Sequence, residues 1–110
     1  MRRLAMFACA AALFAAAAAA CAQSLAKPYV SGDAAAGRTM VEKDCVTCHA
    51  RRFDGDASRI YTRPDRKVRT PAQLLAQVQV CNTELSLSYF PDDEASVAAF
   101  LDREHYRFVP

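Results

Sequence analysis

Two cysteines and a histidine lie within one five-residue run of this chain, Cys45-Val46-Thr47-Cys48-His49. A C-x-x-C-H run is typical of covalent attachment of a c-type haem. The two intervening residues separate the thiols by the distance between the haem vinyl groups, and the thiols add to these groups. The adjacent histidine presents a ring nitrogen to the iron as its proximal ligand. The run therefore predicts one covalent haem c bound through Cys45, Cys48 and His49.

Three other kinds of site use cysteines at this spacing. A zinc site would need a second Cys/His pair at ligand spacing, which the sequence lacks. A dithiol redox centre lies in a βαβ unit, whereas this chain shows little strand pattern. A disulfide between cysteines three apart in a helical turn would have poor geometry. Haem attachment is the interpretation that the rest of the sequence supports.

The first 22 residues fit a secretory signal peptide. Arg2 and Arg3 form a basic start, residues 4–20 are apolar and dominated by alanine, and Ala20-Cys21-Ala22 gives a small-x-small cleavage pattern. The apolar stretch is at the lower limit for an uncleaved membrane anchor. Lipidation of Cys21 is a further alternative, but the usual leucine three residues earlier is missing. We expect export to a bacterial periplasm, with no transmembrane span after processing.

Residues 23–110 are then expected to form one small haem domain, which a covalent haem would help to stabilise. Without the two leader arginines, 12 of the 14 basic residues remain against 12 acidic ones. The charges are uneven, with seven basic against three acidic residues in 51–69 and six acidic against two basic from Asn82 onward. A nucleic-acid-binding domain would be broadly basic, so nucleic acid is not expected as a partner.

Three main helices should position the haem motif, which makes the predicted fold all-α. The first covers residues 34–43, with Ser31 or Asp33 as its cap, and leads into the motif. The second begins with the capping box of residues 70–73 and carries an apolar face. The third begins at Pro91, where an acidic first turn complements the helix dipole. The expected apolar face of the second helix consists of Leu74, Val78, Cys81 and Leu85.

Residues 51–70 are charged and lack helical periodicity, so we expect a loop there. Twenty residues without regular structure are unusual in a compact domain. A loop that wraps one edge of a large prosthetic group would account for this length.

The order of these patterns resembles that of class I cytochrome c domains. Residues 32–40 (GDAAAGRTM) lead into the haem motif as the first helix of that family does, and residues 89–101 (YFPDDEASVAAFL) are similar to its last helix. The resemblance covers nearly all of residues 23–110. It implies a small helical fold in which the first and last helices cross, with Gly37 in contact with Phe100.

The chain departs from that family at the second axial ligand. Most members carry a methionine before the last helix, whereas no methionine follows His49 here, and Met40 is expected to pack in the core. Loss of that ligand predicts a lower reduction potential than a His/Met centre has. A distal donor could come from Cys81, Asn82 or His105, or the position could be open. Cys81 could equally be a buried small side chain, and His105 a surface residue.

Basic and aromatic residues near the motif have a further expected use. The basic cluster could steer an acidic redox partner. Tyr61 and Tyr89 could form hydrogen bonds near the haem or simply pack. Arginines that could clamp the haem propionates, or stay solvated, are Arg51, Arg52, Arg63 and Arg69.

Together these features predict a periplasmic monohaem electron carrier that acts with periplasmic or membrane redox proteins. It would not be an enzyme, because no residue is assigned to make or break substrate bonds. One alternative is a protein that binds or senses O2 or NO at an open or weakly ligated distal site. Another is the haem subunit of a larger oxidoreductase.

Overall fold

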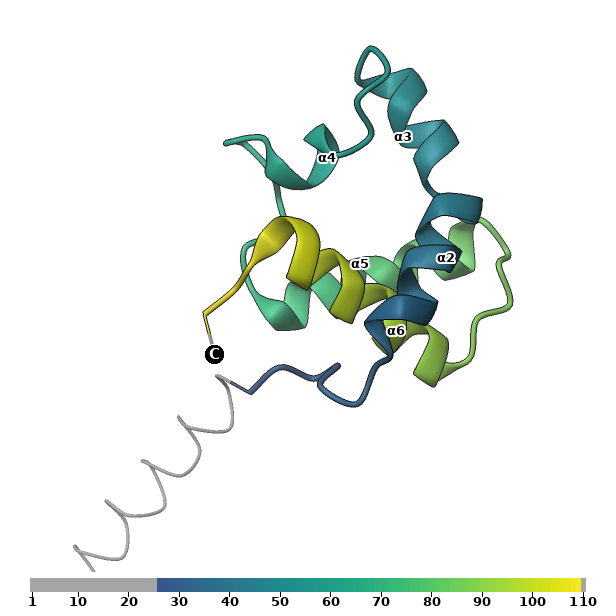
Figure 1. The fold of residues 1–110 in the computed structure, drawn as a ribbon, viewed down its shortest axis with the longest axis vertical. Helices are drawn as coiled ribbons and strands as arrows, with labels where there is room; N and C mark the ends of the chain where they lie inside the picture. The colour runs from purple at the N-terminus through teal and green to yellow at the C-terminus, as the bar shows by residue number, and fades with distance from the viewer. Residues whose placement is uncertain (1–25, 110) are drawn as a thin grey trace, which may run out of the picture.

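The structure is a computed structural model that describes residues 26–109, so the expected signal peptide lies outside the described residues. Throughout 26–109 the regular elements are helices, which confirms the all-α prediction. No helix in this range is long and apolar enough to cross a membrane. The elements are α2 (Ala34–Asp44), α3 (Val46–Arg52), α4 (Arg59–Thr62), α5 (Pro71–Glu84), α6 (Pro91–Leu101) and the π-helix η1 (Asp102–Tyr106) (Figure 1).

Helix α2 begins at one of the two caps that the sequence offers. The carboxylate of Asp33 accepts hydrogen bonds from the backbone N–H groups of Ala35 and Ala36, at 2.9 and 3.2 Å. An acidic cap satisfies amide groups that have no partner within the helix and complements the positive end of its dipole. Asp33, and not Ser31, therefore sets the start of the helix that leads to the haem motif.

Helices α5 and α6 also begin at the predicted signals. The Thr70 hydroxyl accepts from the Gln73 amide at 3.2 Å, but the Gln73 side chain accepts from the amide of Arg69 at 2.8 Å instead of closing the box on Thr70. At α6, the Asp93 carboxylate accepts from the amide of Phe90 at 2.9 Å. Each cap thus fixes the direction in which the preceding loop enters its helix.

Helices α2 and α6 cross in close contact (Figure 1). Gly37 is buried at the crossing, and a Cβ atom there would overlap the carbonyl oxygen of Ser96 and lie 3.0 Å from Cβ of Phe100. The expected contact between Gly37 and Phe100 is therefore confirmed. The Ser96 hydroxyl also accepts from the amide of Asp33 at 3.0 Å, which ties the start of α2 to α6.

The core fills the space between α2, α5 and α6. Leu74 and Val78 of α5 are buried, as predicted from their spacing. Leu85 is 53% exposed, so its predicted place on the apolar face was wrong. The reason is local: α5 ends at Glu84, and Ser86 adopts a left-handed conformation (φ 51°) that turns the chain away from the helix axis.

The predicted loop over residues 51–70 contains more helix than its pattern indicates. Helix α3 continues to Arg52, and α4 occupies Arg59–Thr62. Before α4, the Asp56 carboxylate accepts from the backbone amide and the hydroxyl of Ser58, at 3.0 and 2.6 Å. Such a side-chain turn can start a short helix without any apolar periodicity, which is why the pattern did not predict α4.

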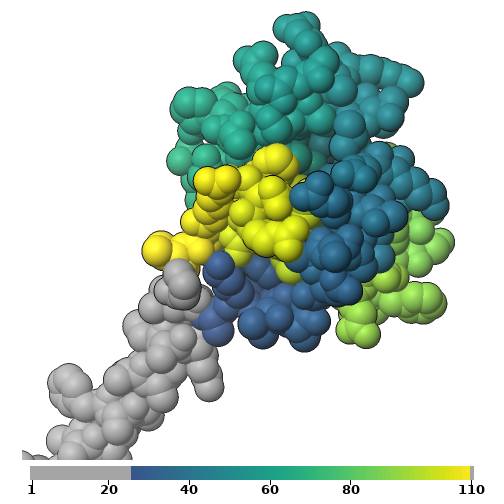
Figure 2. All heavy atoms as spheres, in the orientation of Figure 1, coloured from purple at the N-terminus to yellow at the C-terminus, as the bar shows by residue number. Residues whose placement is uncertain are grey.

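A buried carboxylate joins the two ends of the described chain. Asp102 is 4% exposed and accepts from the Tyr29 hydroxyl at 3.0 Å and from the Phe108 amide at 2.8 Å, and the Lys27 ammonium lies 2.7 Å from it. Partners of this kind offset the cost of removing a carboxylate from water. Figure 2 shows the C-terminal segment, in yellow, lying against α2 and the segment that follows α3.

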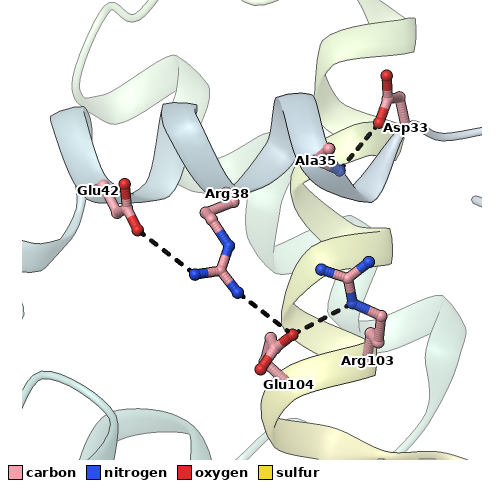
Figure 3. Close-up of polar contacts among 6 residues, drawn as sticks. All are labelled: Asp33, Ala35, Arg38, Glu42, Arg103 and Glu104. Atoms are coloured by element: carbon pink, nitrogen blue, oxygen red, sulfur yellow. Dashed lines mark hydrogen bonds and ion pairs between the residues drawn. The ribbon is translucent and has the colours of Figure 1, made fainter.

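Surface ion pairs link α2 to η1 (Figure 3). The Arg38 guanidinium lies 3.6 Å from Glu104 of η1 and 3.9 Å from Glu42 of α2, and Arg103 lies 3.2 Å from Glu104. These side chains are substantially exposed, so solvent screening leaves the pairs little net stabilisation. Arg38 also lies over the Phe100 ring, 5.4 Å from its centroid, where its stem covers the crossing.

Replacement of Gly37 by alanine should destabilise the fold by about 2–3 kcal/mol, because the added methyl group meets backbone atoms of α6 that cannot move aside. This exceeds the gain of about 1 kcal/mol that alanine brings in helix propensity. Urea unfolding of the purified protein measures the difference. Thr39→Ala, on an exposed position of the same helix, is the control and should change stability by less than about 0.5 kcal/mol. Equal stability of Gly37→Ala and the native protein would contradict the close crossing.

Candidate haem site

The C-x-x-C-H motif occupies the junction between α2 and α3. Cys45 ends α2 and precedes α3, and its carbonyl accepts from the amide of His49 at 3.2 Å. Residues three and four apart in a helix lie on the same face, so Cys45, Cys48 and His49 share one side of a single turn. Cys48 is exposed, whereas Cys45 and His49 are partly buried. The turn therefore presents two thiols and an imidazole together.

A cavity of about 250 Å3 lies beside this turn and opens to the surface on one side. This is slightly below the ~300–1,000 Å3 of common small-molecule sites. Cys45 and His49 contribute to the wall, and Cys48 lies outside the set of lining residues. The apolar part of the wall comes from α4, α5 and α6 and includes Ile60, Leu74, Val78, Val97 and Leu101.

The His49 ring is held by a hydrogen bond at Nδ1. Its Nδ1 atom lies 2.9 Å from the hydroxyl of Tyr61, and the two rings meet edge-on with their centroids 5.4 Å apart. Burial, and then the nearby Arg52 guanidinium, lower the pKa of His49 below its usual value. A neutral imidazole is the form that binds iron, so this environment favours the ligand state.

The environment of Cys45 differs from that of a redox-active dithiol. Burial raises the pKa of the Cys45 thiol to about 11, with smaller contributions from Cys81, Asp44 and Cys48. Reactive thiols have lowered pKa values, so this one is poorly suited to thiol–disulfide exchange. The three cysteines of residues 26–109 are free, and no cluster of three His, Cys, Asp or Glu side chains in this range could hold a metal ion. The zinc and disulfide alternatives gain no support from this geometry.

Basic side chains form part of the wall of the same cavity. Two of the predicted arginines, Arg52 and Arg63, belong to the wall, and Arg66 and Lys67 join them. The Nε atoms of Arg63 and Arg66 are buried without a hydrogen-bond partner. The Asp65 carboxylate lies 3.8 Å from Arg63 Nε, which is beyond hydrogen-bond distance. Buried donors without a partner are rare in proteins, where ordered water, an ion or a ligand usually satisfies them.

The other two predicted arginines are placed elsewhere. Arg51 is exposed, and Arg69 donates to the backbone carbonyls of Arg66 and Pro64 at 3.0 and 2.8 Å, away from the cavity wall. From the sequence, Arg66 and Lys67 were expected only to belong to the basic cluster of residues 51–69. No local pattern distinguishes them from Arg51, because only the tertiary fold determines which side chains line the cavity.

The three candidate distal donors have different surroundings. Cys81 lines the cavity from α5. Asn82 does not line it, because its amide oxygen accepts from the Tyr89 amide at 3.0 Å while its nitrogen donates to the Tyr89 carbonyl at 3.0 Å and to Glu94 at 2.8 Å. His105, on η1, is partly buried and stacks on Tyr61 with ring centroids 4.9 Å apart, one ring away from His49. Burial lowers the pKa of His105, partly offset by Glu104.

The two tyrosines that the sequence left open both form hydrogen bonds near the motif. Tyr61 binds His49 as described, and the Tyr89 hydroxyl donates to the carboxylate of Asp44, the residue before Cys45. Met40 packs against the core, as expected.

No family model, curated protein or solved structure matches this chain. The chemistry of the site therefore rests on its own residues.

Replacement of Asn82 by alanine should destabilise the protein by about 1–3 kcal/mol, because it leaves the backbone groups of Tyr89 without their partner. If the exported protein carries the expected haem, its absorption spectrum should be unchanged, since Asn82 does not line the cavity. Thr83→Ala, the exposed neighbour, is the control and should leave stability nearly unaltered. A changed spectrum at unchanged stability would instead identify Asn82 as an iron ligand.

Proposed function

We propose that this protein is a c-type cytochrome that carries single electrons, with one haem bound through thioether links to Cys45 and Cys48 and with His49 as proximal ligand. The observation that carries the proposal is the placement of the C-x-x-C-H turn, whose Cys45 and His49 form part of the cavity wall. Two thiols and an imidazole on one side of one turn have the arrangement that covalent haem attachment needs.

The rest of the cavity fits a haem in its chemistry. Apolar side chains of α5 and α6 would bury a porphyrin face and exclude water from the iron. In the cavity wall, the Nε donors of Arg63 and Arg66 have no hydrogen-bond partner within the described residues, and the two negatively charged propionates of a haem could accept from them. The neutral His49 imidazole supplies the nitrogen donor.

The bound haem would supply one-electron exchange between Fe(III) and Fe(II). The chain would bind and orient it, hold it through Cys45 and Cys48, and set the basicity of the proximal nitrogen. The crossing of α2 and α6 and the order of the helices support the proposed class I cytochrome c-like fold. A periplasmic location and periplasmic or membrane redox partners belong to the same proposal, because covalent haem proteins of this kind mature after export.

The exported protein should carry one haem that stays bound after denaturation, because thioether links survive unfolding. Intact mass spectrometry of the denatured protein should show the polypeptide plus one haem. The double variant Cys45→Ala/Cys48→Ala should show bare polypeptide, while the control Cys81→Ala should keep the haem. A native mass equal to that of the bare polypeptide would exclude the proposal.

A second candidate function, binding of a diatomic ligand at an open distal position, is favoured by the residues that precede α6. Between Cys81 and Tyr89, the side chains that reach the cavity are those of Cys81, Leu87 and Tyr89. Leu87 has no donor atom, and the Tyr89 hydroxyl is bonded to Asp44. Cys81 is thus the one plausible donor from this segment, and as a thiol it would bind iron weakly.

Carbon monoxide distinguishes the two functions. The reduced native protein should bind carbon monoxide with a shifted Soret band if the distal position is open, and Cys81→Ala should bind it equally fast. Binding only in Cys81→Ala would instead show that Cys81 occupies the sixth position, and binding only in His105→Ala would assign that position to His105. Failure of the native protein and of every one of these variants to bind carbon monoxide would rule out the ligand-binding function.

A further inference from the structure

The Tyr61 hydroxyl has the one side-chain hydrogen bond that reaches His49 in the described part of the chain. Tyr61 belongs to α4, twelve residues after His49, and is 8% exposed. Its oxygen lies 2.9 Å from Nδ1, the ring nitrogen next to the helix backbone. The ring nitrogen left for a metal is therefore Nε2.

Tyr61 is fixed on its other sides by aromatic rings. His105 stacks on it at 4.9 Å with 22° between the ring planes, and Tyr106 meets it edge-on at 5.9 Å. A rigid, neutral hydroxyl in contact with Nδ1 can hold one orientation of the imidazole.

The direction of this hydrogen bond depends on where the metal binds. A phenol can donate or accept, and a neutral imidazole carries one proton on either nitrogen. With iron on Nε2, the proton must reside on Nδ1, and the Tyr61 oxygen becomes the acceptor. A metal-bound histidine that donates its remaining ring N–H group in a hydrogen bond is a more basic ligand and stabilises the oxidised metal.

We propose that Tyr61 is a positioning residue for the proximal ligand: its hydroxyl accepts the Nδ1 proton of His49, orients the imidazole and lowers the reduction potential of the haem. This inference rests on the proposed haem binding and goes beyond it, because the haem could be attached without such a contact. It also gives α4 a role, since this short helix brings the hydroxyl to the motif.

The test is Tyr61→Phe, which removes the hydroxyl and keeps the ring between His49 and His105. Redox titration should show a midpoint potential more positive than that of the native protein. Tyr106→Phe is the matched control, because Tyr106 lines the same cavity and packs on Tyr61 but has no hydrogen bond to His49. An equal shift in both variants, or none in Tyr61→Phe, would overturn the proposal.

A second measurement uses the native protein, so it does not depend on how the variant folds. Proton NMR should detect the Nδ1 proton of His49 and show slow exchange with deuterated solvent. Fast exchange in a haem-loaded native protein would overturn the proposal. Mass spectrometry of each sample separates the two hypotheses: native protein without haem contradicts the proposed function, whereas haem present with an unprotected Nδ1 proton contradicts only the role of Tyr61.

Discussion

The close approach of α2 and α6 at Gly37 is the constraint on which the rest of the structure depends. The backbone of α6 lies where a side chain of α2 would otherwise be, so the two helices can cross in few ways. Cys45 caps the end of α2, and Val97 and Leu101 belong to α6. All three residues line the cavity, so the crossing helps to set the position of Cys45 relative to the apolar part of its wall.

Around that cavity, the chain separates two kinds of environment. Apolar side chains form one part of the wall, and burial together with Arg52 lowers the pKa of His49. Guanidinium groups form another part, and the buried Nε donors of Arg63 and Arg66 have no partner in residues 26–109. Such a combination suits a flat molecule with an apolar body and an acidic edge. A purely apolar ligand would leave the arginines unsatisfied, and a small anion would leave the apolar part of the wall hydrated.

Much of this arrangement could be predicted from local patterns. Caps at Asp33 and Thr70, the acidic start of α6 and the five-residue motif are encoded within a few residues, and the contact of Gly37 with Phe100 was expected from a family resemblance. Helix α4 was missed, because its start depends on a side-chain turn at Asp56 and not on apolar spacing. The partner of His49 was left open for a related reason: a tyrosine hydroxyl reaches it only through the tertiary fold, which no sequence spacing specifies.

The carboxylate of Asp102 has a consequence for the order of assembly. It binds Tyr29, which lies 73 residues earlier, and contacts between such distant segments form only after a long stretch of chain has been closed. If the protein is exported as proposed, this contact cannot form until Asp102 has crossed the membrane. Cys45 and Cys48 precede Asp102 in the chain, so the proposed attachment of haem could come before the two ends of the described chain meet.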